Sequence, residues 1–147
     1  MLKGIPTILS PDLLKVLAEM GHGDVLVFGD IHYPAASTAK NSILIRCDGH
    51  NNTDLLDAIL QLLPLDNSVE HPVTLMQVQA CDNVETPVWD EFKSIVGKYD
   101  PRGEKAFTSI ERFAFYEKAK QAYAVLATSE KALYGCFMIQ KGVVIQN

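Results

Sequence analysis

The sequence predicts an α/β protein in which helices and strands form stacked layers. Segments with apolar residues at helical spacing alternate along the chain with short runs of strand-forming residues. One of these runs, Val25–Phe28, is apolar at every position, which is typical of a strand covered on both faces. The composition, 48% hydrophobic and 21% charged, is that of an ordinary globular protein, and 147 residues suit a single domain over positions 1–147.

Four helices are expected, and each has a recognisable start. Ser10-Pro11-Asp12 supplies a hydroxyl N-cap, a proline at the first helical position and an acid near the positive end of the dipole. This helix runs to Met20, and Gly21 is expected to close it in a left-handed conformation. Thr53-Asp54 and Thr86-Pro87 open two further helices, and residues 110–122 favour a fourth.

Strands are expected between these helices, where apolar residues run together or alternate. Polar segments rich in glycine, proline or small residues, at 31–37 and 100–105, are expected to be loops. The expected strands are 25–28, 42–46, 73–78, 123–128 and 133–139.

Charge and cysteine content exclude several functional classes. The net charge is −5 and the basic residues are dispersed, so neither a nucleic-acid partner nor a membrane-surface helix is expected. No apolar run approaches the roughly 20 residues of a membrane span, and the N-terminus lacks the apolar region of a signal peptide. Three widely spaced cysteines, Cys47, Cys81 and Cys136, suit neither a disulfide framework nor a zinc site. We therefore expect a cytoplasmic protein.

The stretch from Met20 to Asp30 carries the most suggestive polar residues. His22 lies between two glycines after the first helix, and a histidine side chain titrates near neutral pH. It is either a residue that interacts with the helix dipole or a general acid. Asp30, at the exit of the buried strand, either caps a turn or binds two neighbouring hydroxyl groups. Metal-ligand, phosphate-loop and serine-nucleophile motifs are absent from the sequence, so no cofactor or metal is expected.

Several motifs in the same order along the chain resemble one known family. They are Leu-Lys-Gly-Ile-Pro near the start, the segment Leu9–Asp24 that ends in Met-Gly-His-Gly-Asp, Arg-Phe-Ala-Phe-Tyr-Glu-Lys-Ala from Arg112, and Ala-Leu-Tyr-Gly from Ala132. Together they resemble the RbsD/FucU family of sugar mutarotases over nearly the whole chain. Thr86-Pro87-Val88-Trp89 is similar to an insertion in the animal branch that acts on L-fucose.

The resemblance implies a fold and an activity. The fold is a three-layer α/β/α sandwich around a mixed, mostly parallel sheet. The activity is the interconversion of the α and β anomers of L-fucose by acid–base catalysis without a cofactor. A ribose-type pyranose/furanose activity and a sugar-binding protein without catalysis are the alternatives. Family members form ring-shaped homo-oligomers, decamers in bacteria, with sites near the subunit interfaces.

The resemblance also assigns the site. His22 corresponds to the proton donor, and the sugar is bound by Asp30, Arg112 and the segment Tyr134-Gly135-Cys136. Tyr116 and Tyr134 are candidate partners in proton transfer. One departure concerns Cys136, because other members carry asparagine there. A thiol replaces an amide poorly as a hydrogen-bonding group, so the sugar affinity or preference is expected to differ.

Overall fold

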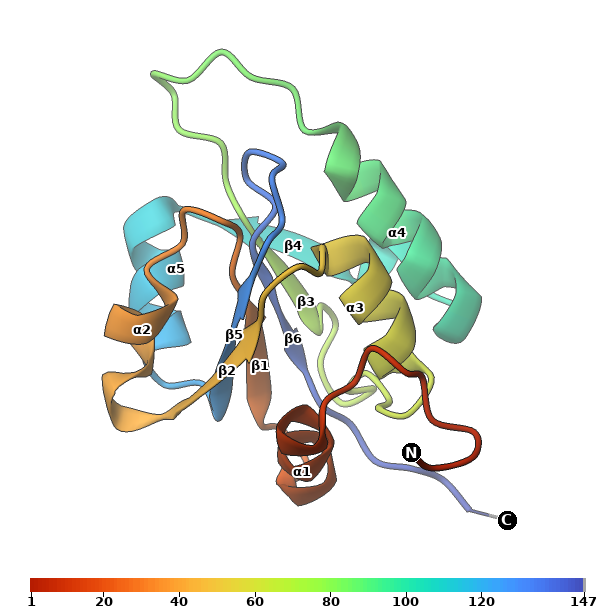
Figure 1. Cartoon of the computed structure of the whole chain (residues 1–147). Coiled ribbons are helices and arrows are strands. Elements are labelled where there is room, and N and C mark those ends of the chain that lie inside the picture. Colours follow the sequence, from red (N-terminus) through yellow and green to blue (C-terminus); the bar gives the residue numbers. More distant parts are fainter. Residues whose placement is uncertain (147) are drawn as a thin grey trace.

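A mixed sheet lies at the centre of the fold (Figure 1). The computed structural model describes residues 1–146, and within them the sheet has six strands. In spatial order they are β2 (Ile43–Cys47), β5 (Ala124–Thr128), β1 (Val25–Phe28), β6 (Phe137–Gln140), β3 (Val73–Met76) and β4 (Phe107–Ile110). Only β6 runs antiparallel to its neighbours among these strands, so the sheet is mostly parallel, as predicted. Asn147, the last residue of the predicted domain, lies outside the described residues.

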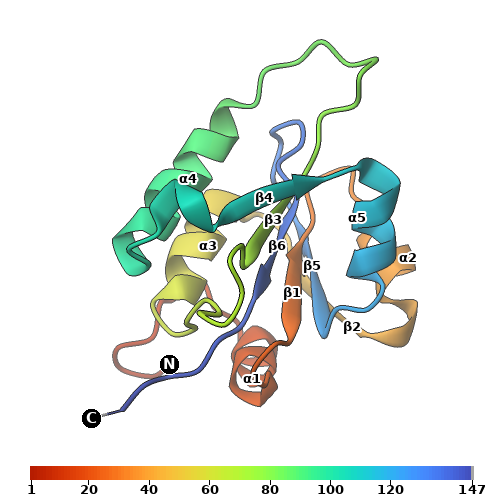
Figure 2. The same cartoon turned by 180° about the vertical axis from the view of Figure 1, so that it is seen from behind.

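Helices cover both faces of this sheet (Figures 1 and 2). Because successive side chains of a strand point to opposite faces, Leu26 and Phe28 of β1 belong to one buried cluster and Val27 to another. The first cluster includes residues of α1 (Pro11–Glu19), α3 (Asn52–Leu60) and α4 (Pro87–Tyr99), and the second includes residues of α2 (Ala35–Thr38) and α5 (Arg112–Ala119). The three-layer sandwich is confirmed. Within residues 1–146 no helix is long and apolar enough to cross a membrane.

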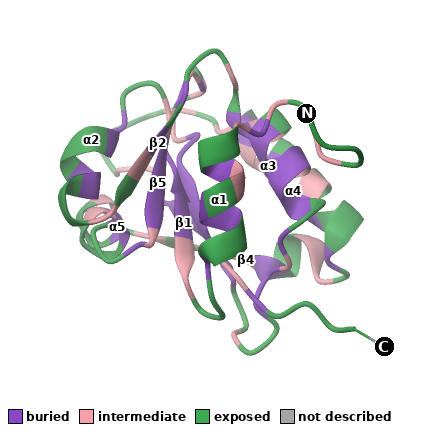
Figure 3. Cartoon of the chain, turned by 60° about the horizontal axis from the view of Figure 1, so that its bottom comes forward, coloured by how far each residue is buried: buried purple, intermediate pink, exposed green. Residues whose placement is uncertain are grey.

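The first helix forms as its sequence predicts. The Ser10 hydroxyl accepts a hydrogen bond from the backbone N–H of Leu13 at 3.1 Å and caps the helix. Leu13, Val16 and Leu17 are buried on the side that faces the sheet, whereas the opposite side of α1 is exposed (Figure 3). Its C-terminus therefore brings residues 20–24 to the start of β1.

Predictions for three helices are wrong at a boundary. The helix expected over 110–122 is α5 (Arg112–Ala119), and Ile110 ends strand β4. Helix α3 is capped by Asn51, whose side chain accepts from the N–H of Asp54 at 2.8 Å, and Thr53 lies inside the helix. An asparagine is as good an N-cap as a threonine, so composition alone could not separate them. Gly21 does not adopt the left-handed conformation, since α1 ends in extended backbone at Met20 and the positive φ of +88° occurs at Gly23.

The strand prediction misses β4 and extends β6 too far. Strand β4 lies at the edge of the sheet and is only partly buried, so it has no apolar run that would mark it. Strand β6 begins at Phe137, and residues 133–136 form a loop. The loop expected at 31–37 contains the start of the single-turn helix α2. Residues of both segments, 31–37 and 133–136, line the cavity described below.

Candidate active site

A cavity lies at the edge of the sheet where β1 and β3 end and β6 begins. Because β6 is antiparallel, its first residue, Phe137, pairs with Phe28 on one side and with Leu75 on the other. The loops at these strand ends and helix α5 surround a cavity of about 340 Å³, a size typical of small-molecule sites. It is lined by Asp30, His32, Tyr33, Met76, Gln79, Asp82, Arg112, Tyr116, Leu133, Tyr134 and Cys136.

Asp30 supplies the carboxylate of this cavity. Burial raises the pKa of Asp30 above its ordinary value, although hydrogen bonds from the backbone of His32 and Tyr33 and the nearby His32 side chain oppose that shift. The N–H of His32 donates to Oδ1 at 3.0 Å and fixes the orientation of the carboxyl group. A partly desolvated carboxylate is a strong acceptor for hydroxyl groups. Asp30 can therefore bind a polyhydroxylated ligand.

Arg112 and Tyr116 form a pair on α5. Arg112 Nε donates to the Tyr116 hydroxyl at 3.1 Å, one helical turn away. This bond raises the pKa of Arg112, whose guanidinium also lies 5.4 Å from the ring centres of Phe113 and Tyr116. Because the Tyr116 oxygen accepts from Arg112, its own proton is available to a ligand. The pair can thus polarise a ligand oxygen and donate a proton to it.

Cys136 lines the side of the cavity nearest to β6, and Gly135 directly precedes it in the chain. Cys136 is 1% exposed. Burial, and then the charge of Asp30, raises the pKa of its thiol, so the group is protonated at neutral pH. Gly135 does not line the cavity, but its carbonyl accepts from Asn52 Nδ2 at 2.8 Å. The same amide nitrogen donates to the carbonyl of Gly29 at 3.2 Å. Asn52 therefore joins the backbone segments that carry Asp30 and Cys136.

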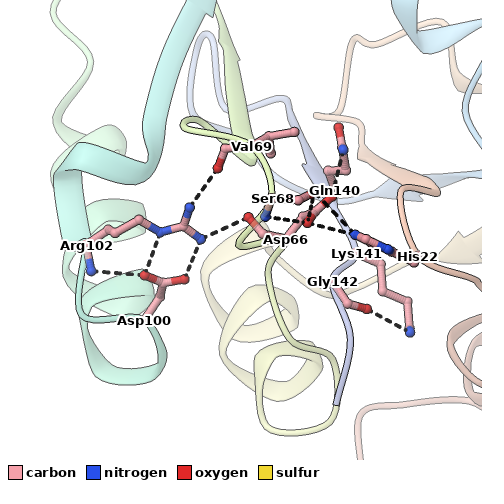
Figure 4. Close-up of polar contacts among 9 residues, drawn as sticks. All are labelled: His22, Asp66, Ser68, Val69, Asp100, Arg102, Gln140, Lys141 and Gly142. Carbon is pink, nitrogen blue, oxygen red and sulfur yellow. Dashed lines mark hydrogen bonds and ion pairs between the residues drawn. The ribbon is translucent and has the colours of Figure 1, made fainter. Parts of the chain in front are cut away.

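His22 lies at the other end of the sheet and does not line this cavity. It precedes β1 whereas Asp30 follows it, so roughly 10 Å of strand separates the two segments. His22 Nε2 is 3.0 Å from Oδ1 of Asp66 and 3.4 Å from the hydroxyl of Ser68 (Figure 4). Its side chain is 50% exposed, whereas that of Asp66 is 2% exposed. The His22 ring thus lies at the surface and is held there by its hydrogen bond to the buried Asp66 carboxylate.

Asp66 is fixed by an extensive set of donors (Figure 4). Ser68 donates from its N–H and its hydroxyl at 2.9 and 2.7 Å, and Gln140 Nε2 donates at 2.9 Å. Burial alone would raise the pKa of Asp66, but hydrogen bonds from Ser68, His22 and Gln140 outweigh it and lower the pKa below its ordinary value. Arg102, paired with Asp100, donates to the Asp66 carbonyl at 3.1 Å. Asp66 is therefore a rigid anionic partner for His22.

The structure thus brings together most of the predicted site residues but leaves one apart. Asp30, Arg112, Tyr134 and Cys136 line one cavity, Gly135 supports it, and His22 belongs to a separate cluster. Sequence reasoning missed further polar members of both places, since none of them belongs to a local motif; all except Gln140, the last residue of β6, come from loops. They are Gln79 and Asp82 in the cavity and Asp66, Ser68 and Gln140 beside His22.

The fold and the cavity define a class of α/β protein that binds a small polar molecule at a sheet edge. Carboxylate, guanidinium, phenol and thiol groups converge there. In the part of the chain that the structure describes, no cluster of three or more metal-ligating side chains occurs. The converging carboxylate, guanidinium and phenol groups suit acid–base chemistry on a hydroxylated molecule.

The chain belongs to the RbsD / FucU transport protein family, whose model matches residues 3–144. It is similar to the fucose mutarotase of Homo sapiens, with 47% identity over 99% of this chain and 96% of the human protein. It is also similar to the crystal structure of FucU from Bifidobacterium longum, with 52% identity, a TM-score of 0.96 and coverage of 97% and 100% of the two chains. A fucose mutarotase from Streptococcus pneumoniae, solved in complex with L-fucose, is 44% identical with a TM-score of 0.92, over 98% of this chain and all of that one.

Proposed function

We propose that this chain interconverts the α and β anomers of L-fucose. The observation that carries the proposal is the convergence of Asp30, Arg112 and Tyr116 on one cavity. It is supported by the 44% identity to a fucose mutarotase whose structure contains L-fucose. The reaction opens a cyclic hemiacetal, rotates the aldehyde and recloses the ring. It conserves all atoms and needs no redox partner.

The chemistry requires one proton donor and one proton acceptor. Ring opening transfers a proton to the ring oxygen and removes one from the anomeric hydroxyl, and reclosure on the other face of the aldehyde reverses both transfers. Each positioned acid or base typically contributes a factor of about 10²–10⁴. Because the uncatalysed reaction already proceeds slowly in water, side chains of this kind are sufficient.

The cavity residues take separate roles in this proposal. Asp30 accepts hydrogen bonds from neighbouring sugar hydroxyls, and Arg112 polarises a sugar oxygen. Of the two tyrosines considered from the sequence, Tyr116 has a free hydroxyl proton, whereas the Tyr134 hydroxyl already donates to Asp82. We therefore assign contact with the anomeric hydroxyl to Tyr116, and the Asp30 carboxylate in the same cavity takes up the proton that leaves that hydroxyl and returns it on reclosure. Cys136 contacts the sugar through its neutral thiol and the adjacent backbone.

We propose that His22 serves the cavity of a neighbouring copy of the chain. One end of the sheet carries the cavity and the other carries His22 beside Asp66, so a head-to-tail contact between two copies would bring them together. Such contacts close into a ring when the repeated rotation completes a full turn with no rise along its axis. The chain would then act as a homo-oligomer in which His22 protonates the ring oxygen. The three cysteines, all within residues 1–146, are free thiols, which supports a location in the reducing cytoplasm.

Anomer-resolved NMR exchange on L-fucose tests the proposed function. Unmodified protein should accelerate exchange between the α and β signals, and His22→Ala should abolish most of that acceleration. His71→Ala is the matched control, because His71 is exposed and, in the described structure, its side chain has one hydrogen bond, to the Lys105 carbonyl, and one ion pair, with Glu70. Binding of L-fucose without acceleration would favour a sugar-binding protein, and acceleration confined to D-ribose would favour the ribose-type activity.

A further inference from the structure

A projecting loop contributes part of the cavity wall. Residues 77–86, here called the arm, connect β3 to α4 and extend well beyond the sheet (Figures 1 and 2). Two arm residues, Gln79 and Asp82, line the cavity beside Tyr134. The arm contains no helix or strand, so its position depends on the contacts that it makes.

Tyr134 has an unusual backbone conformation at this wall. Its φ is +56°, the one positive value of a residue other than glycine in the described chain. An L-residue seldom adopts this region unless its surroundings impose it. Trp89 Nε1 donates to the Tyr134 carbonyl at 2.8 Å, which holds the backbone from the side of α4.

The Tyr134 side chain is held by the arm. Its hydroxyl donates to the Asp82 carboxylate and accepts from the backbone N–H of Gln79 at 3.1 Å. The arm thus engages the Tyr134 hydroxyl both as a donor and as an acceptor. Asp82 supplies the only charged partner of that hydroxyl within residues 1–146, and a bond to a carboxylate is stronger than one between neutral groups.

The segment behind Tyr134 has little freedom of its own. A Cβ at Gly135 would lie 2.8 Å from Glu130 Cγ and 2.9 Å from the Ala132 carbonyl. The Gly135 carbonyl is held by Asn52 at 2.8 Å. Residues 134–136 are thus held from behind and from α4, and the Tyr134 phenol adds the contact that holds them to the arm.

We propose that Asp82 is a positioning residue for the sugar site. By accepting the Tyr134 hydroxyl, it joins the arm to the segment 134–136 and fixes both as one wall of the cavity. The inference rests on the proposed function, because it assigns that wall to sugar binding. Asp82 is exposed, and a bond between exposed groups contributes little to the stability of the fold. Its contribution is therefore to a preorganised cavity, which lowers the cost of ordering side chains on binding.

Substitutions on the arm separate positioning from general stability. We expect Asp82→Ala to raise KM for L-fucose about tenfold, the factor that corresponds to 1.4 kcal/mol, with kcat changed less than about twofold. Asp82→Asn should have a smaller effect, since an amide oxygen can still accept from Tyr134. Glu85→Ala is the matched control: it removes an exposed carboxylate from the same arm, and Glu85 does not line the cavity. It should leave KM unchanged.

A double-mutant cycle and a titration identify the partner. If Asp82 acts through the phenol, Asp82→Ala should add nothing to KM in a Tyr134→Phe background. The bond to Asp82 raises the pKa of Tyr134, so the ultraviolet titration of one tyrosine should move to lower pH in Asp82→Ala. An unchanged KM in active Asp82→Ala, additive effects in the cycle, or an unchanged titration would each overturn the inference. The activity of the unmodified protein on L-fucose is measured in the same experiments, and its absence would overturn the proposed function rather than the role of Asp82.

Discussion

The carboxylate of Asp66 gives the most quantitative prediction. Asp66→Asn removes a buried anion that accepts four hydrogen bonds. The amide nitrogen that replaces one carboxylate oxygen is itself a donor, so it cannot accept from the groups that donated to that oxygen. A buried donor left without an acceptor costs about 1–3 kcal/mol, and the amide oxygen retains part of the network, so we expect a loss of about 2 kcal/mol. For a chain of this size that lowers the melting temperature by roughly 4–8 °C.

The effect of Asp66→Asn should depend on pH with a defined sign. The folded protein holds the pKa of Asp66 below the unfolded value of about 3.9. Its stabilising contribution is therefore complete above that value and is lost as the pH falls below it. The difference in unfolding free energy between the unmodified protein and Asp66→Asn should be constant near neutral pH and shrink below about pH 4.

Urea unfolding followed by the fluorescence of Trp89, the single tryptophan, measures this difference at each pH. Glu70→Gln is the matched control, because Glu70 is an exposed carboxylate in the same loop. Asp66→Asn should also lower kcat about tenfold, part of the contribution of a positioned general acid, with little change in KM. Equal stability of the two proteins at pH 7, or a difference that persists unchanged to pH 3, would refute the role assigned to Asp66.

Two further predictions concern the cavity. Because burial raises the pKa of Asp30, sugar binding should weaken on acidification at a pH above the ordinary aspartate range. Asp30→Asn should raise KM and remove this pH dependence, which is measured by determining KM as a function of pH. A rise of KM at low pH that persists in the variant would contradict this prediction. Cys136→Asn places an amide in the cavity and should lower KM for L-fucose severalfold, as measured by anomer exchange. Cys47→Ala is the control, because Cys47 is a buried thiol outside the cavity. An unchanged KM in Cys136→Asn would mean that this side chain does not contact the sugar.

Local signals predicted most of the fold. The cap at Ser10 and the apolar run of β1 depend on neighbouring residues, and both were predicted at the observed positions. Strand β4 escaped prediction because an edge strand that is only partly buried has no local pattern. The loop at 133–136 was predicted as strand because its residues are apolar or aromatic, whereas its conformation is imposed by distant contacts with the arm and α4.

The candidate site was less accessible to sequence reasoning. Asp30 and Cys136 meet because β6 is antiparallel to β1, and the sequence of neither strand predicts that pairing. Asp66 lies 44 residues from His22, so no spacing could relate them. The glycine-flanked histidine was the most prominent feature of the sequence, and the structure places it apart from the cavity, a separation that only an arrangement of several copies would remove.

Subunit mixing tests the central claim most directly. His22→Ala lacks the proposed proton donor but keeps its cavity, whereas Arg112→Ala keeps His22 but lacks the cavity guanidinium. Each variant alone should be nearly inactive in anomer exchange on L-fucose. If the two are unfolded, mixed in equal amounts and refolded together, about a quarter of the contacts in a head-to-tail ring join an intact His22 to an intact cavity, so about a quarter of the original activity should return. Activity that stays at the level of the separate variants would contradict a site shared between copies.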